Sequence, residues 1–150
     1  MTTDDTGSRS HSIEDLIDPK LRPLIKTSES PSEKSHLIGN RCNMCGEYFF
    51  PKRVICPNCL KEEPLEEVLL SNKGKLYTYS VVKAAPLGFQ SPYVMGYVDL
   101  PEGLRILSPI AEYENETLRI GMDMEVIVDK IREDDTGNPV YGYKFRPASL

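Results

Sequence analysis

The segments RCNMCG at residues 41–46 and CPNC at residues 56–59 decide the fold of this chain, because they contain all four of its cysteines. Each holds a Cys-x-x-Cys pair, and ten residues separate the two pairs. One such turn points two sulfurs at a metal, so two facing turns form a closed tetrahedral site, the arrangement of structural zinc centres. We therefore predict one structural Zn²⁺ with four thiolate ligands, Cys42, Cys45, Cys56 and Cys59.

Disulfide bonds and redox chemistry are the other uses of paired cysteines. The first twelve residues are polar and acidic, without the basic start and apolar run of an export signal. Cys-x-x-Cys pairs in a chain without such a signal usually indicate metal or redox chemistry rather than disulfides. A thioredoxin-like pair lies next to a βαβ unit, and neither pair here does. Zinc binding is the favoured interpretation.

The composition restricts the partners that the chain can take. Its formal net charge is −5, and four metal-bound thiolates with one dication would make the chain still more acidic. No segment forms a basic patch, so affinity for a phosphate backbone is not expected. No apolar stretch approaches the roughly 18–20 residues that cross a bilayer. We expect a cytoplasmic protein that binds neither nucleic acid nor membrane.

The sequence predicts a rubredoxin-like zinc ribbon over residues 36–64. Between the cysteine pairs, residues 47–55 predict a β-hairpin with an aromatic strand, a turn at Pro51-Lys52 and a second short strand. A module this small buries too little apolar area to fold alone, so the metal would supply much of its folding free energy. Its three consecutive aromatic residues exceed its packing needs, and we expect at least one to contact the next domain or a partner.

Residues 1–35 are predicted to form a flexible tail and a short helical arm. Ser12 is a candidate N-cap, and apolar residues share a helical face until Pro19. A second apolar cluster follows at residues 21–25, and a polar linker comes after it. Two alternatives stay open: the arm folds back onto its own domain, or it docks on a partner protein.

Residues 65–150 have the periodicity of strands, so the chain is predicted to be mainly β. Turn sequences separate five candidate strands, at 75–82, 93–100, 104–110, 124–131 and 140–145. This pattern is typical of a five-stranded OB-fold barrel, and an SH3-like barrel would give a similar one. Asn72-Lys73-Gly74 is predicted to be a turn before the first of them.

Reactive groups are few once the cysteines bind metal. The sequence has no Ser/His/Asp arrangement and no Gly-rich phosphate loop, so the chain alone is predicted to be non-catalytic. The loop at residues 83–92 is long and proline-stiffened, and loops of this kind on rigid scaffolds often carry function, with disorder as the alternative. Lys83, Phe89 and Tyr93 are its candidate residues for a substrate channel or a partner contact.

Residues 36–147 resemble a family of small zinc-ribbon plus OB-fold proteins that accompany thiolases and related acyl-CoA enzymes. The resemblance rests on motifs in the expected order: R41-C-x-x-C-G46, F50-P-x-R53, C56-P-x-C59, N72-K-G-K-L-Y-T-Y79, P92-Y-V94, V98-D-L-x-E-G-x-R-I106, I120-G-M-x-M-x-V126 and Y143-x-F-x-P147. The chain departs from the family at its N-terminal segment, which lacks an aromatic pair, and at Lys52, where the family has proline.

The resemblance implies a non-catalytic subunit of a heteromeric acyl-CoA thiolase that performs thiolytic C–C cleavage or condensation. A thiolase-fold partner would supply the nucleophilic cysteine and the base, with a CoA thioester at or near the interface. Family members act in archaeal mevalonate synthesis and in bacterial degradation of sterols and aromatic acids. Within the family, the chain resembles in particular the small subunit of the benzoylsuccinyl-CoA thiolase of anaerobic toluene degradation.

A single-stranded nucleic-acid-binding module is the alternative function, because zinc ribbons and OB barrels often have that role. Such a platform needs aromatic residues interleaved with Lys and Arg. Here Tyr77, Tyr79 and Tyr97 lie among Thr, Ser and Asp, and the overall charge is acidic. The thiolase-subunit interpretation is favoured.

Overall fold

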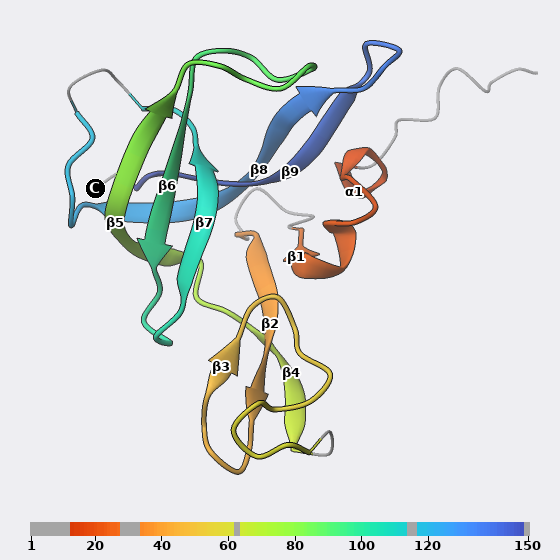
Figure 1. Cartoon of the computed structure of the whole chain (residues 1–150), viewed down its shortest axis with the longest axis vertical. Coiled ribbons are helices and arrows are strands. Elements are labelled where there is room, and N and C mark those ends of the chain that lie inside the picture. The colour runs from red at the N-terminus through yellow and green to blue at the C-terminus, as the bar shows by residue number, and fades with distance from the viewer. Residues whose placement is uncertain (1–12, 28–33, 62–63, 114–116, 149–150) are drawn as a thin grey trace, which may run out of the picture.

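The computed structural model describes residues 13–27, 34–61, 64–113 and 117–148, so the predicted flexible tail and the Ser12 N-cap lie outside the described residues. Within these residues, two short helices precede nine strands, and Figure 1 shows their arrangement. The elements are α1 (Ile13–Leu16), η2 (Arg22–Leu24), β1 (Ile25–Lys26), β2 (His36–Cys42), β3 (Tyr48–Phe49), β4 (Leu65–Leu69), β5 (Lys73–Val82), β6 (Tyr93–Asp99), β7 (Arg105–Ile110), β8 (Asp123–Glu133) and β9 (Pro139–Pro147). Neither helix has the length or apolar character to span a membrane.

Strands β5 to β9 form a closed barrel in the order β5-β6-β7-β9-β8. Its pairs are antiparallel except β7 with β9, which run parallel and meet through the pair Ile110↔Phe145. A closed five-stranded barrel with this connectivity is an OB fold, so the prediction is confirmed. The predicted turn at residues 72–74 is wrong, because Lys73 and Gly74 already pair with β8 as the start of β5.

Apolar residues at alternate positions of the five strands fill the barrel. In β6, for example, Val94, Gly96 and Val98 are buried, and the residues between them face outward. The buried hydrophobic residues of the barrel and its adjoining turn are Leu76, Val94, Val98, Leu100, Ile106, Ile110, Met124, Val126 and Phe145. Their strand-like spacing explains why periodicity alone located this domain.

The ribbon is a small sheet around β2, and it differs from the predicted hairpin. Strands β1 and β3 pair with β2, and so does β4, over five residue pairs. Residues 53–55, predicted to be a strand, are not one. The Asn40 side chain binds the backbone of Arg53 instead, since its Nδ2 donates to Arg53 O (2.7 Å) and its Oδ1 accepts from Arg53 N (3.3 Å).

The predicted N-terminal helical segment is not borne out, because it contains only single turns of four and three residues. Pro19 follows α1 closely and cannot continue it, and the backbone pairs with the barrel instead. Asp18 N donates to Tyr141 O at 2.9 Å, next to the bridge between Ile17 and Tyr141. Of the two alternatives for the arm, the structure therefore shows the first, in which it folds back onto its own domain.

The arm packs closely on the barrel. Ile17 is only 1% exposed. Leu21 lies so close to Gly142 in β9 that a Cβ atom at Gly142 would come within 2.7 Å of Leu21 Cδ1. The missing side chain of Gly142 thus makes room for the arm.

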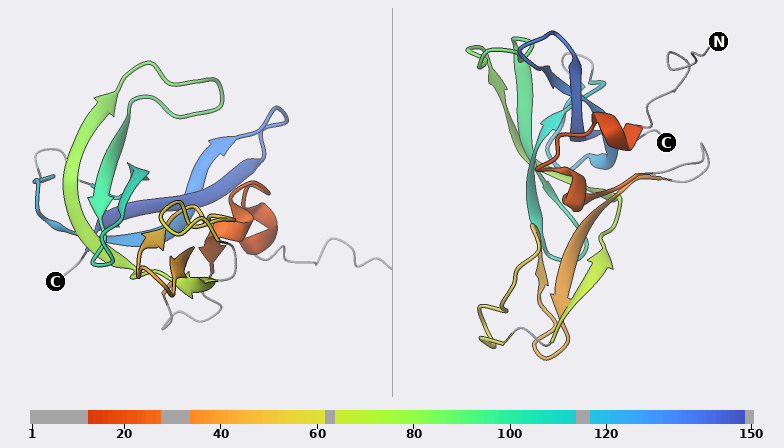
Figure 2. Two further views of the ribbon diagram at one scale, coloured as in Figure 1. Left: turned by 60° about the horizontal axis from the view of Figure 1, so that its bottom comes forward. Right: turned by 90° about the vertical axis from the view of Figure 1, so that its right-hand side faces the viewer.

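Aromatic and polar contacts join the ribbon to the barrel, from which it projects at one end (Figures 1 and 2). The Phe50 ring meets the Tyr143 ring edge-on, with centroids 5.9 Å apart, as expected for one of the three consecutive aromatics. Glu102 Oε2 accepts from Ser71 N (2.7 Å) and Ser71 Oγ (2.9 Å). The linker between the two modules is thereby tied to the β6–β7 turn.

A buried carboxylate on β8 ties the start of the ribbon to the barrel. Glu125 pairs with Lys34 at 3.0 Å and with Arg146 at 2.9 Å. Burial alone would raise the pKa of Glu125, but these two cations outweigh it and hold the pKa below its ordinary value. The pairs therefore keep the carboxylate charged.

Candidate metal centre and partner surfaces

The four cysteines converge at the end of the ribbon, where their sulfur atoms all lie within 4.8 Å of one another. The Sγ atoms of Cys42 and Cys59 are 3.7 Å apart, and those of Cys45 and Cys56 are also 3.7 Å apart. Sulfurs at about 2.3 Å from a tetrahedral zinc lie about 3.8 Å from each other. The donor set and its spacing therefore fit Zn²⁺, and the four cysteines are positioned to bind a metal.

The two knuckles repeat one backbone pattern. Gly46 N donates to Cys42 O (2.8 Å), and Leu60 N donates to Cys56 O (2.6 Å). Both residues after the second cysteine of a pair have positive φ, +81° at Gly46 and 59° at Leu60. Glycine adopts this conformation freely, whereas a leucine there costs about 1–2 kcal/mol. Other interactions at the metal centre must therefore offset the backbone cost of the second knuckle.

Hydrogen bonds give two of the sulfurs different pKa values. The backbone N–H of Cys45 lowers the pKa of Cys42 to about 6, and Cys45 N lies 3.5 Å from Cys42 Sγ. The hydrogen bond with Cys42 raises the pKa of Cys59 to about 12. Asn58 Nδ2 also donates to Cys45 Sγ at 3.8 Å. The ribbon thus supplies donors to its sulfurs, as metal-binding thiolates require.

Comparison with known proteins agrees with this architecture. Residues 33–64 match the family model "ChsH2, rubredoxin-like zinc ribbon domain", and residues 67–129 match "ChsH2, C-terminal OB-fold domain". A DUF35 domain-containing scaffold protein of Methanocaldococcus jannaschii is 48% identical over 83% of this chain and 90% of its own length. The chain belongs to the DUF35 family.

Two further relatives carry more specific names. The benzoylsuccinyl-CoA thiolase subunit BbsA of Thauera aromatica is 40% identical to this DUF35 chain, over 84% of the chain and 86% of BbsA. A solved structure titled "Ltp2-ChsH2(DUF35) aldolase" matches with a TM-score of 0.60 and 29% identity. That match covers 76% of this chain and 86% of the other. The family resemblance stated from the motifs is confirmed.

The loop at residues 83–92 lies at the end of the DUF35 barrel opposite the ribbon (Figures 1 and 2). The structure therefore does not bring Lys83, Phe89 and Tyr93 to the metal centre. The Phe89 ring stacks on the Tyr93 ring, with centroids 6.2 Å apart. Glu133 N donates to Gly88 O at 2.9 Å, which joins the loop to the end of β8.

Within the loop, Ser91 Oγ donates to Lys83 O. The Lys83 side chain is exposed and forms no ion pair with another described residue. The loop is therefore held by contacts within itself and with β8, and it has an exposed cation at its first residue.

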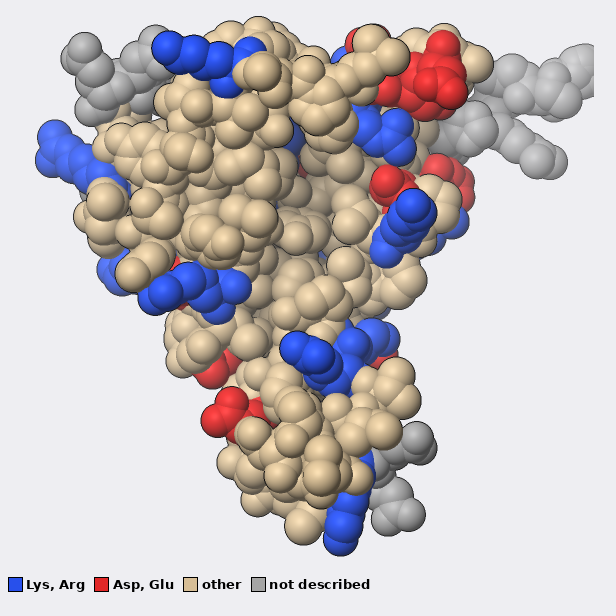
Figure 3. Space-filling view, in the orientation of Figure 1, with Lys and Arg blue, Asp and Glu red and all other residues tan. Residues whose placement is uncertain are grey.

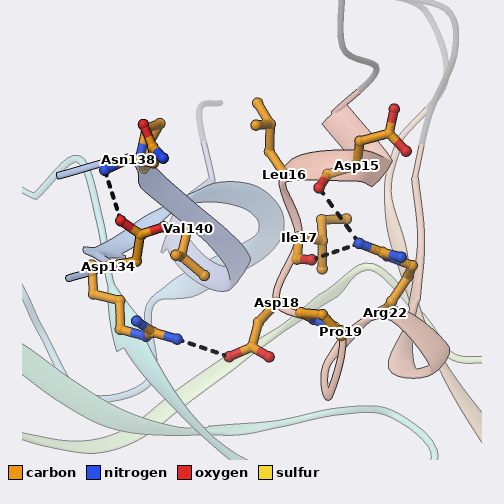
Figure 4. Close-up of a pocket in the computed structure, with 11 residues that line it drawn as sticks. Asp15, Leu16, Ile17, Asp18, Pro19, Arg22, Asp134, Asn138 and Val140 are labelled. Atoms are coloured by element: carbon orange, nitrogen blue, oxygen red, sulfur yellow. Dashed lines mark hydrogen bonds and ion pairs between the residues drawn. The ribbon is translucent and has the colours of Figure 1, made fainter. Parts of the chain in front are cut away.

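A pocket that the sequence did not indicate lies between the arm and the β8–β9 hairpin (Figure 4), with a volume of about 550 Å³. Its charged lining consists of Asp15, Asp18, Asp134, Arg22 and Arg132, one more carboxylate than guanidinium groups. Arg132 lies 3.5 Å from Asp18, and Arg22 Nη2 donates to Ile17 O at 3.1 Å. The charged lining of the pocket therefore carries a formal net charge of −1. Only the folded arm brings these residues together, so no local motif signals the pocket.

The three tyrosines considered for nucleic-acid binding do not form one platform. A register shift between Leu76 and Thr78 places Tyr79 opposite the buried Gly96, on the inner face of β5. Tyr77 stays outside, where the Arg105 guanidinium lies 3.4 Å from its ring centroid. That stack occupies one ring face, and Arg105 also pairs with Asp99. Tyr79 therefore lies on the opposite face of β5 from Tyr77.

Proposed function

We propose that this chain is a non-catalytic, zinc-containing scaffold subunit of a heteromeric acyl-CoA enzyme of the thiolase type. The observation that carries the proposal is that its only four cysteines all converge in the metal centre. Thiolase chemistry needs a free nucleophilic thiol and a base. A thiolase-fold catalytic subunit therefore supplies both, in a cytoplasmic hetero-oligomer.

Zinc has a structural role in this proposal. Four thiolates close the coordination sphere and leave no position for substrate. Bound by Cys42, Cys45, Cys56 and Cys59, the metal would supply folding free energy to the ribbon. The ribbon in turn fixes β2, which pairs with β4, and it places Phe50 against Tyr143 of the barrel.

The relatives support the partner more firmly than they support the acyl group. One relative is named as a scaffold protein and another as a subunit of benzoylsuccinyl-CoA thiolase. We take thiolytic cleavage, or the reverse condensation, of a CoA thioester near the subunit interface as the reaction. Benzoylsuccinyl-CoA, in aromatic and toluene degradation, is a candidate substrate because BbsA is 40% identical.

Complex formation tests the proposal. The chain, co-expressed with the thiolase-fold protein encoded in the same genome, is expected to elute with it as one hetero-oligomer in size-exclusion chromatography with light scattering. A mixture that elutes as two separate species, at micromolar concentrations of both, contradicts the proposal. The controls are each protein chromatographed alone.

The loop at residues 83–92 is proposed to lie at the acyl-CoA entrance of the complex. Phe89→Ala is expected to lower turnover about tenfold with assembly unchanged, because the stacked ring would cover the acyl group and exclude water. Lys83→Ala is expected to raise the KM for the CoA thioester a few-fold, because this exposed cation would meet its phosphates. Steady-state kinetics of the assembled variants measure both effects. Kinetic constants like those of the wild type would show the loop to be a simple connection.

A further inference from the structure

The outward face of strands β5 to β7 carries a row of exposed apolar side chains. Thr78 pairs with Tyr97, and Tyr97 pairs with Leu107, so these residues are direct cross-strand neighbours. Tyr77, Tyr97 and Leu107 are between 40% and 47% exposed. We call these three residues the β5–β7 face.

Two of the cations beside this face are paired with carboxylates. Arg105 pairs with Asp99 through two hydrogen bonds, at 2.7 and 3.2 Å, while it covers the Tyr77 ring. Lys75 pairs with Asp123 at 2.5 Å. Figure 3 shows a broad surface over β5 to β7 that is uncharged in its middle and has Lys and Arg at its borders. A surface of this kind suits a protein partner with a neutral, apolar contact and not a polyanion.

The face continues into the loop that the proposed function places at the acyl-CoA entrance. Val82 pairs with Tyr93 at the far end of β5, on the same side of the sheet as Tyr97. Phe89 stacks on Tyr93. One protein seated on the β5–β7 face would therefore also contact the loop at residues 83–92.

We propose that the β5–β7 face is the surface on which the thiolase-fold catalytic subunit docks; this inference rests on the proposed function. Exposed tyrosines are enriched at the centres of interfaces, where they supply most of the binding energy. The arm cannot compete for this face, because it occupies the outer side of β9 at Gly142. The exposed apolar tip of the ribbon, which includes Val54, is the rival surface.

The test compares charge insertions at matched positions. Leu107→Glu and Tyr97→Glu are expected to weaken binding to the purified catalytic subunit at least about 30-fold, the effect of removing a 2 kcal/mol hot spot. Leu69→Glu is the matched control, because Leu69 is also a strand leucine, 54% exposed, and lies on β4 away from the face. It is expected to bind like the wild type. Biolayer interferometry measures the affinities, and zinc content and thermal unfolding confirm that each variant is folded.

The outcomes separate this inference from the function on which it rests. Failure of the wild type to bind would overturn the proposed function, and the inference with it. Wild-type binding with equal affinity for both face variants would overturn the inference alone, as would loss of binding in Val54→Glu. If a glutamate variant does not fold, Leu107→Ala and Tyr97→Ala replace it, with an expected loss of about fivefold to tenfold. Binding of a poly-dT oligonucleotide that Tyr97→Ala abolishes would also contradict the inference.

Discussion

Cys56→Ser is expected to abolish metal binding and to unfold the ribbon. Cys56 is buried, and its sulfur lies 3.7 Å from that of Cys45 across the site. A serine hydroxyl is a poor zinc ligand, and in small zinc domains the metal contributes about 10–16 kcal/mol to folding. The ribbon has only short strands around β2 to replace that contribution. The zinc content should fall from one per chain to almost none.

Metal analysis and limited proteolysis together measure this effect. Residues 34–61 should become protease-sensitive in Cys56→Ser. Asn58→Ser is the matched control, because Asn58 lies in the same knuckle and only donates a hydrogen bond to Cys45. It should keep its zinc. Full zinc content in Cys56→Ser, or no zinc in the wild type, would contradict a four-thiolate site.

Phe145→Ala is expected to destabilise the chain by about 3–5 kcal/mol, the usual cost of removing a buried phenylalanine. Phe145 is fully buried, and it pairs with Ile110 in the one register pair that joins β7 to β9. It also pairs with Val126 on the other side. The truncation would therefore open a cavity at the point where the barrel closes.

Chemical denaturation, followed by circular dichroism, measures the free energy of unfolding for this series. Phe145→Leu is the matched control and should cost clearly less, because it keeps most of the apolar volume. A loss below about 1 kcal/mol in Phe145→Ala would show that this position does not hold the barrel closed.

Features that depend on local spacing could be read from the sequence. The Cys-x-x-Cys pairs fix the metal centre, because each knuckle is a short turn that brings its own two sulfurs together. Strand periodicity located all five strands of the barrel, whose alternate residues are buried. The motifs between residues 36 and 147 identified the family in the same way.

Features that depend on contacts between residues far apart in the sequence could not be predicted from it. The Asn40 side chain captures the backbone of Arg53, thirteen residues away, and this contact replaces the strand predicted at residues 53–55. The arm pairs with Tyr141 instead of continuing as a helix. A one-residue register shift in β5 turns Tyr79 to the inner face, which simple alternation does not reveal. Neither these two contacts nor the register shift leaves a recognisable pattern in the neighbouring sequence.

Titration of this chain into the purified thiolase-fold subunit tests the central claim most directly. We predict no thioester cleavage by the chain alone and little by the catalytic subunit alone. Activity should rise with added chain and saturate at the stoichiometry of the complex. Turnover by the chain alone, or a catalytic subunit equally active without it, would contradict a non-catalytic scaffold subunit.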